Sequence, residues 1–361
     1  MNNNIGVITI PIGVGEKGLP LGLTITPLVA NMLAKNLGAI NILGINTFDT
    51  YRENREKFIP KYVKQLSEMG ILPDAIWHDR REKERIINVF KKLEEKGYLR
   101  RENAKVLKCE CGKVEMLKES KTREKAKLYQ QHDDSIICKQ CGKIRELDKE
   151  VLVMHFPQNI EKPINSVAIN RNEANDLMDR ISGMKYLVSR ERNTGIEYNG
   201  FNIDVDFTFL NFLNTMNFKQ NVIIGSNHVN WHMCMAVALK KCLDEEAENF
   251  IVATPYVYDK DHLLPEITSR LEGRKDLKKV YLLSCLTWKR KSTNWSTETL
   301  KTFERCSEEE LKRILENVEN PSRQGTTEEM IEGALKKMKK DTLIRVKNGI
   351  QYSNVEENDE R

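Results

Sequence analysis

Apolar and polar positions along the first fifty residues follow the pattern of a strand, a helix and a second strand. Residues 5–12 are an apolar run typical of a buried strand, and the glycines and proline between Gly13 and Gly22 indicate a turn. Thr24 is placed to cap a helix that continues to about Leu37, and residues 40–45 form the next apolar run. This βαβ pattern predicts a parallel sheet with helices on its faces.

The remaining chain predicts further α/β structure, interrupted by a small insertion. Residues 51–100 are expected to be mainly helical, whereas residues 105–150 combine short strands, two cysteine pairs and a polar middle, as in a knob inserted outside the sheet. An apolar helix is expected from Trp231 to Leu243, and charged helix formers fill residues 297–342. Later strand candidates are residues 151–156, 203–210, 221–225, 250–253 and 280–283.

The amino-acid composition indicates which broad class of protein the chain belongs to. The chain of 361 residues is 40% hydrophobic and 31% charged, as in soluble globular proteins, and its net charge of +5 permits a polyanionic partner without requiring one. No apolar run approaches the roughly 20 residues that span a bilayer, and the first residues lack the basic region of a signal peptide. Two close cysteine pairs and four scattered cysteines are typical of reduced thiols, so we expect a cytoplasmic protein with no membrane partner.

The two cysteine pairs predict a structural zinc site. Cys109 and Cys111 form one pair, Cys138 and Cys141 form the other, and a glycine follows each pair. Two thiolate pairs on tight turns provide the tetrahedral sulfur cage that Zn²⁺ prefers, and four sulfur ligands leave no open position for a substrate. The first pair has one spacer residue where two are commoner, and the alternative is two unligated pairs or disulfides.

Several stretches, in order along the chain, carry a resemblance to a known family. Residues 11–28 resemble a strand, turn and helix with a HIGH signature, residues 43–49 resemble the end of the next strand, and residues 186–196 (YLVSRERNTGI) are similar to an ISRQR…WG stretch. Residues 225–232 (GSNHVNWH) resemble a GKDIxxFH segment. Together, over roughly residues 5–295, the chain resembles the catalytic domain of the class I aminoacyl-tRNA synthetases for methionine, isoleucine, leucine and valine.

The resemblance implies an α/β fold with a Rossmann-like parallel sheet of the HUP type, an inserted zinc knob and a short helical C-terminal region. The expected divisions are residues 1–104 for the first half of the catalytic domain with its helical segment, 105–150 for the zinc knob, 151–296 for the second half of the catalytic domain, 297–353 for the helical region and 354–361 for a disordered tail.

The resemblance also implies ATP-dependent activation of an amino acid to an aminoacyl-adenylate, with Mg²⁺ accompanying ATP, and transfer to tRNA or another acceptor. Catalysis is assigned to Lys291, for the leaving pyrophosphate, and to Thr24, for phosphate. Asn46 and Asp49 are assigned to the amino group of the substrate, and Arg190 to a substrate or tRNA contact. The nucleotide and substrate pocket is assigned to Gly22, Thr24, Gly225, Asn227, His228, His232 and Lys289.

Both signature motifs of the family are degenerate in this chain. Registered on Gly22, the two histidine positions of HIGH hold Pro20 and Leu23, and neither side chain can donate a hydrogen bond. The candidate for the KMSKS loop is residues 288–292 (WKRKS), whose last two residues match. The chain after it is too short for the usual helical anticodon-binding domain, so anticodon-based selection of tRNA is not expected.

Each assigned residue has a structural alternative. The basic stretch can be an ordinary surface loop, His232 can be a histidine satisfied at a helix start, and Asp49 can cap the following helix. Arg190 can hold a surface turn. Asp204 and Asp206 alternate on a predicted strand and are expected to be exposed to solvent rather than to form an acid pair.

Three functions remain open at this point. The chain can be an amino-acid-activating enzyme, an inactive pseudo-synthetase that binds tRNA, an amino acid or a protein partner, or a transferase that uses preformed aminoacyl-tRNA. The amino acid, the acceptor and the oligomeric state do not follow from the sequence. The geometric test is whether the glycine turn ahead of Thr24 and the basic stretch around Lys291 meet at one cleft of a parallel sheet.

Overall fold

A parallel β-sheet forms the centre of the protein. The computed structural model describes residues 4–48, 55–108, 114–116, 129–132, 135–138, 141–143, 145–163, 171–190, 195–286, 292–320 and 325–342. The strands of this sheet are β1 (Ile5–Thr9), β2 (Ile12–Gly13), β3 (Ile40–Asn46), β4 (Ala75–His78), β14 (Gln220–Ser226) and β15 (Glu248–Thr254). In the order β15–β14–β1–β3–β2 neighbours pair in parallel, and β4 also pairs in parallel with β3. The predicted parallel sheet is confirmed.

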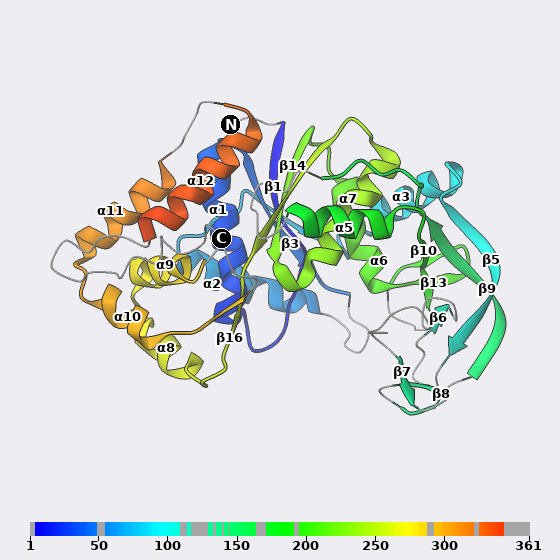
Figure 1. Ribbon diagram of the computed structural model, residues 1–361, viewed down its shortest axis with the longest axis horizontal. Coiled ribbons are helices and arrows are strands. Elements are labelled where there is room, and N and C mark those ends of the chain that lie inside the picture. Colours follow the sequence, from blue (N-terminus) through cyan, green and yellow to red (C-terminus); the bar gives the residue numbers. More distant parts are fainter. Residues whose placement is uncertain are drawn as a thin grey trace, which may run out of the picture.

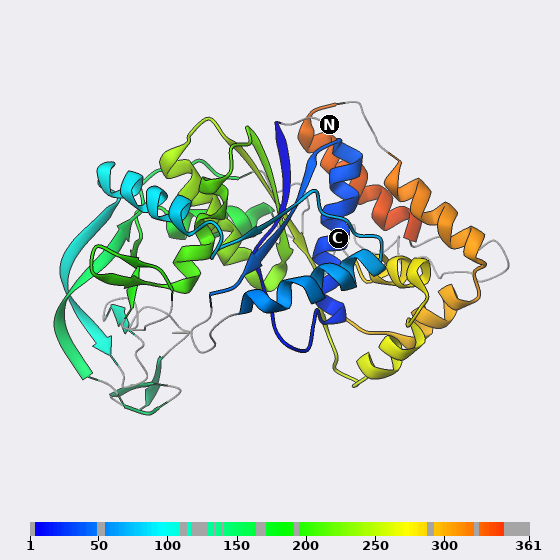
Figure 2. The same cartoon turned by 180° about the vertical axis from the view of Figure 1, so that it is seen from behind.

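Alternate residues of the central strands belong to two separate hydrophobic cores. In β14, Val222 and Ile224 face one core, and Ile223 between them faces the other. The first core is covered by α1 (Ile25–Leu37), α2 (Ile59–Glu68), α8 (Leu264–Arg270), α9 (Lys275–Ser284), α10 (Thr297–Glu304), α11 (Glu308–Glu319) and α12 (Thr327–Thr342). The second is covered by α3 (Lys83–Glu95), α5 (Arg171–Ile181), α6 (Val205–Leu210) and α7 (Asn230–Leu243). Figures 1 and 2 show the sheet between these two layers.

Helix α1 is buried almost all round. Every residue of α1 except Lys35 is buried, because the sheet covers one side and α9, α11 and α12 pack against the other. Gly38 adopts a left-handed conformation (φ 61°) that ends the helix where the sequence predicts. Among the described helices, none combines the length and the apolar character that crossing a bilayer requires.

A second β region projects from the α3 and α7 side of the sheet (Figure 1). The strands β5 (Leu99–Lys108) and β9 (Arg145–His155) pair antiparallel along their whole length. This region lies outside the parallel sheet, and its two main strands are long and extend beyond residues 105–150, where short strands were expected. The smaller strands are β6 (Val114–Met116), β7 (Tyr129–His132), β8 (Ser135–Cys138), β10 (Lys185–Leu187), β11 (Ser189–Arg190), β12 (Glu197–Tyr198), β13 (Phe201–Ile203), β16 (Tyr256–Tyr258) and β17 (Ser292–Asn294).

Two predicted strands are helices. Residues 280–283 lie in α9, whose apolar residues are buried on several sides, so the helical period is hidden in a continuous apolar run. Most of residues 203–210 lie in α6, which begins after Asp204, whose carboxylate accepts a hydrogen bond from the amide of Asp206 (2.8 Å). Asp204 is therefore a buried cap, 2% exposed, and the prediction of an exposed strand residue is wrong. Strand β4, within a region predicted to be mainly helical, was missed.

Candidate functional site

The carboxyl ends of β1 and β14 mark the point where the strand order reverses. From β1 the chain passes through α1 to β3 on one side, whereas from β14 it passes through α7 to β15 on the other side. In open α/β sheets the connections diverge at such a point and leave a crevice outside the carboxyl ends of the strands, where ligands bind. This edge of the sheet is therefore the candidate functional site.

The glycine turn after β1 packs closely against β16. A short 3-10 helix, η1 (Leu21–Thr24), leads directly into α1. A Cβ atom on Gly22 would lie 3.6 Å from Cζ2 of Trp295 and 3.8 Å from the carbonyl oxygen of Val257. The buried hydroxyl of Thr24 donates to the carbonyl oxygen of Leu21 (2.5 Å) and makes no capping bond to α1. Thr24 precedes α1 as predicted, but its hydroxyl bonds within its own turn.

The segment that follows the predicted basic loop lies beside this turn. Lys289 and Lys291 are outside the described residues, and β17 begins directly after them. β17 pairs in parallel with β16, with Thr293 opposite Val257. Trp295, just after β17, lies where a Cβ atom added to Gly22 would come into van der Waals contact with it. The glycine turn and the segment that ends the basic stretch therefore meet at the same edge of the sheet.

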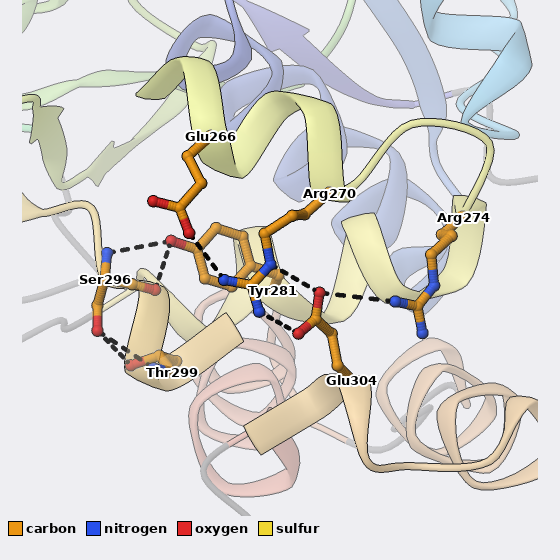
Figure 3. A network of polar contacts seen from close by, with 7 residues as sticks. All are labelled: Glu266, Arg270, Arg274, Tyr281, Ser296, Thr299 and Glu304. Atoms are coloured by element: carbon orange, nitrogen blue, oxygen red, sulfur yellow. Dashed lines mark hydrogen bonds and ion pairs between the residues drawn. The ribbon is translucent and has the colours of Figure 1, made fainter. Parts of the chain in front are cut away.

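Polar contacts with the C-terminal helices hold this segment in place (Figure 3). The hydroxyl of Tyr281, on α9, accepts from the amide of Ser296 and donates to the carbonyl oxygen of Ser296, both at 3.1 Å. The ring of Tyr281 also stacks on Trp295, with 6.2 Å between ring centroids. Glu304 of α10 accepts from Nε of Arg270 on α8 (3.0 Å). Tyr281 of α9 thus holds the segment that follows β17, and the Arg270–Glu304 contact joins α8 to α10.

The carboxyl end of β3 carries a polar side chain and a buried carboxylate beside it. Asn46 is the last residue of β3, and its Oδ1 atom is buried without a hydrogen-bond partner in the part of the chain that the structure describes. Asp79, after β4, accepts hydrogen bonds from the amide (2.8 Å) and hydroxyl of Thr47 and from the amide of Phe48 (3.1 Å). Burial raises the pKa of Asp79, and the Thr47 hydrogen bonds oppose that shift. Asp49 lies outside the described residues.

The carboxyl end of β14 runs directly into α7 through the short helix η4 (Asn227–Val229). A Cβ atom on Gly225 would lie 2.8 Å from Sδ of Met233 and 3.0 Å from Cγ2 of Ile10. Only glycine therefore fits where α7 and β1 approach β14 this closely. The tight packing places Asn227 and His228 directly after the carboxyl end of β14.

Two histidines lie near the start of α7, His228 in η4 and His232 in the first turn of α7. Oγ of Ser226 and Nδ1 of His228 are 2.5 Å apart, and the His228 ring meets the ring of Tyr256 edge-on with centroids 5.1 Å apart. Partial desolvation of the imidazole lowers the pKa of His228. The ring of His232, one turn further along, lies 5.9 Å from that of Phe209.

Arg190 does not lie on the parallel sheet. It ends β11, and its guanidinium forms an ion pair with the buried carboxylate of Asp204. Burial raises the pKa of Asp204 to about 6, with Arg190 opposing the shift. The described contacts of Arg190 are therefore those of a structural ion pair.

The described cysteines of the knob, Cys138 and Cys141, lie near one end of the β5–β9 ladder. Cys138 ends β8 and is buried, Cys141 is partly exposed, and the amide of Gly142 donates to the carbonyl oxygen of Cys138 (2.9 Å). Cys109 and Cys111 lie outside the described residues. Within the described ranges no group of three or more His, Cys, Asp or Glu side chains is arranged to hold a metal ion.

The structure thus gathers Gly22, Thr24, Asn46 and the residues from Gly225 to His228 at one edge of the sheet. Sequence reasoning missed four further residues at this edge or directly behind it. They are Asp79, Ser226, Tyr256 and Trp295. A signal existed for Ser226, which lies within the quoted stretch 225–232, and for Asp79, which follows an apolar segment that the structure shows to be strand β4.

Comparison with known proteins supports the fold. No family model and no curated protein matches the chain. Among solved structures, Mycobacterium tuberculosis methionyl-tRNA synthetase in complex with methionyl-adenylate matches with a TM-score of 0.62 and 11% identity, over 94% of this chain and 82% of the other. A second structure of that synthetase, also bound by methionyl-adenylate, matches with a TM-score of 0.60 and 11% identity, over 88% of this chain and 71% of the other. The chain therefore has a fold similar to that of these class I synthetases.

Proposed function

We propose that this protein is a class I synthetase-like enzyme that activates an amino acid with ATP. The observation that carries the proposal is the meeting of the glycine turn, at the start of α1, with the β17 segment that follows the basic stretch. Both border the crevice at the switch point of the sheet, where ligands of open α/β folds bind. The turn lies at the start of α1, and the N-terminal end of a helix favours an anionic phosphate.

The proposed reaction is an in-line displacement at phosphorus. A carboxylate oxygen of the amino acid bonds to the α-phosphorus of ATP, and the bond from that phosphorus to the oxygen of pyrophosphate breaks. Such transfers depend on positioning and positive charge rather than on covalent chemistry by the protein. Mg²⁺ arriving with ATP would neutralise part of the phosphate charge.

Residues of this chain supply binding and charge. The turn from Gly22 into α1 would receive phosphate, and Lys289 and Lys291 would stabilise the leaving pyrophosphate. Asn46 would accept from the substrate ammonium, because its buried Oδ1 has no partner within the described ranges. Asp49 would pair with the same ammonium. The pocket between them would be completed by Asn227, His228 and His232.

Exchange of labelled pyrophosphate into ATP tests this function. We expect exchange that depends on one of the twenty amino acids, and Lys291→Ala is expected to lower its rate about 10–100-fold because one stabilising charge is lost. Lys301→Ala, on the exposed side of α10, is the matched control and should leave the rate unchanged. Absence of both exchange and nucleotide binding with every amino acid would contradict the proposal.

An inactive binding protein is the second candidate, because Pro20 and Leu23 occupy the positions of the HIGH histidines. Pro20 has no amide hydrogen, so this part of the turn offers phosphate fewer donors. Binding of tRNA or of an amino acid without pyrophosphate exchange would favour that function. The same binding measurements compare tRNA with other molecules as the acceptor of the aminoacyl group.

We also propose that the knob binds one structural Zn²⁺ through Cys109, Cys111, Cys138 and Cys141. Lys108, the residue before Cys109, pairs with Arg145, which follows shortly after Cys141. The connections that carry the two pairs therefore leave the same end of the β5–β9 ladder. Gly142, at φ 69°, allows the tight turn after the second pair. Four thiolates would supply a closed site that stabilises the knob without taking part in catalysis.

Metal analysis tests the zinc proposal. Protein purified without chelator should contain about one equivalent of zinc, and Cys138→Ser should lose it and become sensitive to proteolysis between β5 and β9. Cys306→Ser, which changes a buried cysteine among the C-terminal helices, is the control and should keep its zinc. Less than about half an equivalent in the unmodified protein would contradict the proposal.

A further inference from the structure

A serine and a histidine form a close pair at the candidate site. Ser226 is the last residue of β14, and its Oγ lies 2.5 Å from Nδ1 of His228. The pair stands at the carboxyl edge of a central strand, beside the crevice. A neutral imidazole in hydrogen-bond contact with a hydroxyl is the arrangement that activates serine as a nucleophile.

The contact between Ser226 and His228 differs from the hydrogen bond that a serine usually makes at the start of a helix. Ser226 is the cap residue of η4, with an extended backbone (φ −82°, ψ 158°). Serine at such a position ordinarily accepts a hydrogen bond from an amide two or three residues ahead. Here the side chain makes no capping bond and its hydroxyl is paired with the imidazole instead.

The surroundings hold the pair in place. Gly225 packs against Met233 and Ile10 so closely that a Cβ atom would lie within 3.0 Å of both, which fixes the turn from β14 into α7. The ring of Tyr256 meets the exposed ring of His228 edge-on and covers one side of it. Because partial desolvation lowers the pKa of His228, the ring is neutral near pH 7 and able to take a proton.

We propose that Ser226 and His228 form a nucleophile–base pair that accepts an acyl group from an activated acyl ester or acyl phosphate. Oγ of Ser226 bonds to the carbonyl carbon, and the bond from that carbon to the leaving oxygen breaks. The hydroxyl proton passes to Nδ1 of His228 and then to the leaving group. In the second half, His228 takes a proton from the acceptor, water or an amine, as the acceptor displaces Ser226, and returns that proton to Oγ. Under the proposed function the acyl donor is the aminoacyl-adenylate, so this inference extends that function.

The probe for this activity is p-nitrophenyl acetate, with no ATP added. We expect a burst of nitrophenolate and a covalent acetyl group that mass spectrometry of peptides assigns to Ser226. Ser226→Ala should lose the burst and the adduct, Ser226→Cys should retain an acetyl adduct on sulfur, and His228→Gln should slow acylation at least about 10-fold. Ser67→Ala, which removes an exposed serine bonded to a backbone carbonyl, should behave as the unmodified protein.

Two results would contradict the proposal that Ser226 and His228 act as a nucleophile–base pair. One is an acetyl adduct that is absent or found only on other residues, in protein whose melting temperature is unchanged. The other is acylation of Ser226 at the same rate in His228→Gln, which would remove the histidine from the chemistry. Because the probe carries its own activated acyl group, neither result depends on adenylation, and failure of pyrophosphate exchange leaves this test intact.

Discussion

Replacing Asp79 with alanine is expected to lower the free energy of unfolding by about 3–4 kcal/mol. The carboxylate is fully buried and accepts from the amides of Thr47, Phe48 and Arg80 and from the Thr47 hydroxyl. Alanine would leave several buried donors without partners, each costing about 1–3 kcal/mol, partly offset by removing a buried charge. Urea unfolding measures the loss, and hydrogen exchange should show faster exchange at the amides of Thr47 and Phe48.

Asp74→Ala provides the matched control for Asp79→Ala. Asp74 is an exposed carboxylate at the opposite end of β4, where it accepts one hydrogen bond from the amide of Asn41 (2.8 Å). Water can replace that bond, so its loss should cost less than about 1 kcal/mol. Equal losses for the two variants would mean that Asp79 does not hold the carboxyl end of β3, next to Asn46.

The helices and strands that could be predicted from the sequence are those with a clear hydrophobic periodicity or with a glycine that marks their end. Strand β1, helix α1 and strand β3 were identified because a glycine turn separates two apolar runs and Gly38 ends the helix. Strands β14 and β15 are buried on both faces and appear as continuous apolar runs. Helix α7 was recognised by its length as much as by its period.

The missed elements share a physical cause. Residues 280–283 form an apolar run in both a buried strand and a buried helix, and only packing of α9 between α1 and the later helices decides between them. Strand β4 is four residues long and starts with an exposed alanine, so no alternation is visible. For such short or fully buried segments tertiary contacts override local preference.

Only some residues of the candidate site could be predicted from the sequence. Residues next to glycine turns and strand ends, such as Gly22, Asn46 and Gly225, were assigned to the site through the resemblance of their stretches to the synthetase motifs, and the structure places them at carboxyl ends of the parallel strands or directly after them. Trp295 and Tyr256 reach the site through the parallel pairing of β16 and β17, which are more than thirty residues apart in sequence. Strand pairing between segments so far apart leaves no local pattern in the sequence from which it could be predicted.

Replacing Arg190 with methionine is expected to lower the free energy of unfolding by about 3–5 kcal/mol at pH 7.5. Methionine keeps the apolar stem but leaves the carboxylate of Asp204, 2% exposed, without its counter-ion. The loss should shrink as pH falls toward 5. Burial already raises the pKa of Asp204 from its ordinary range to about 6, and removing Arg190 raises it further, so protonation stabilises the folded variant as pH falls through that pKa.

A double-mutant cycle separates the ion pair from simple loss of packing. Asp204→Asn keeps an oxygen that can cap α6, so the double variant of Arg190→Met and Asp204→Asn should recover most of the stability that Arg190→Met loses. Arg270→Met is the control, because its partners Glu266 and Glu304 are both more exposed than Asp204, and ion pairs that water reaches contribute less than about 1 kcal/mol. A pH-independent loss in Arg190→Met, or one no larger than in Arg270→Met, would show that Asp204 does not depend on Arg190 for its charge. Arg190 would then be free to serve a bound ligand, as the family resemblance implies.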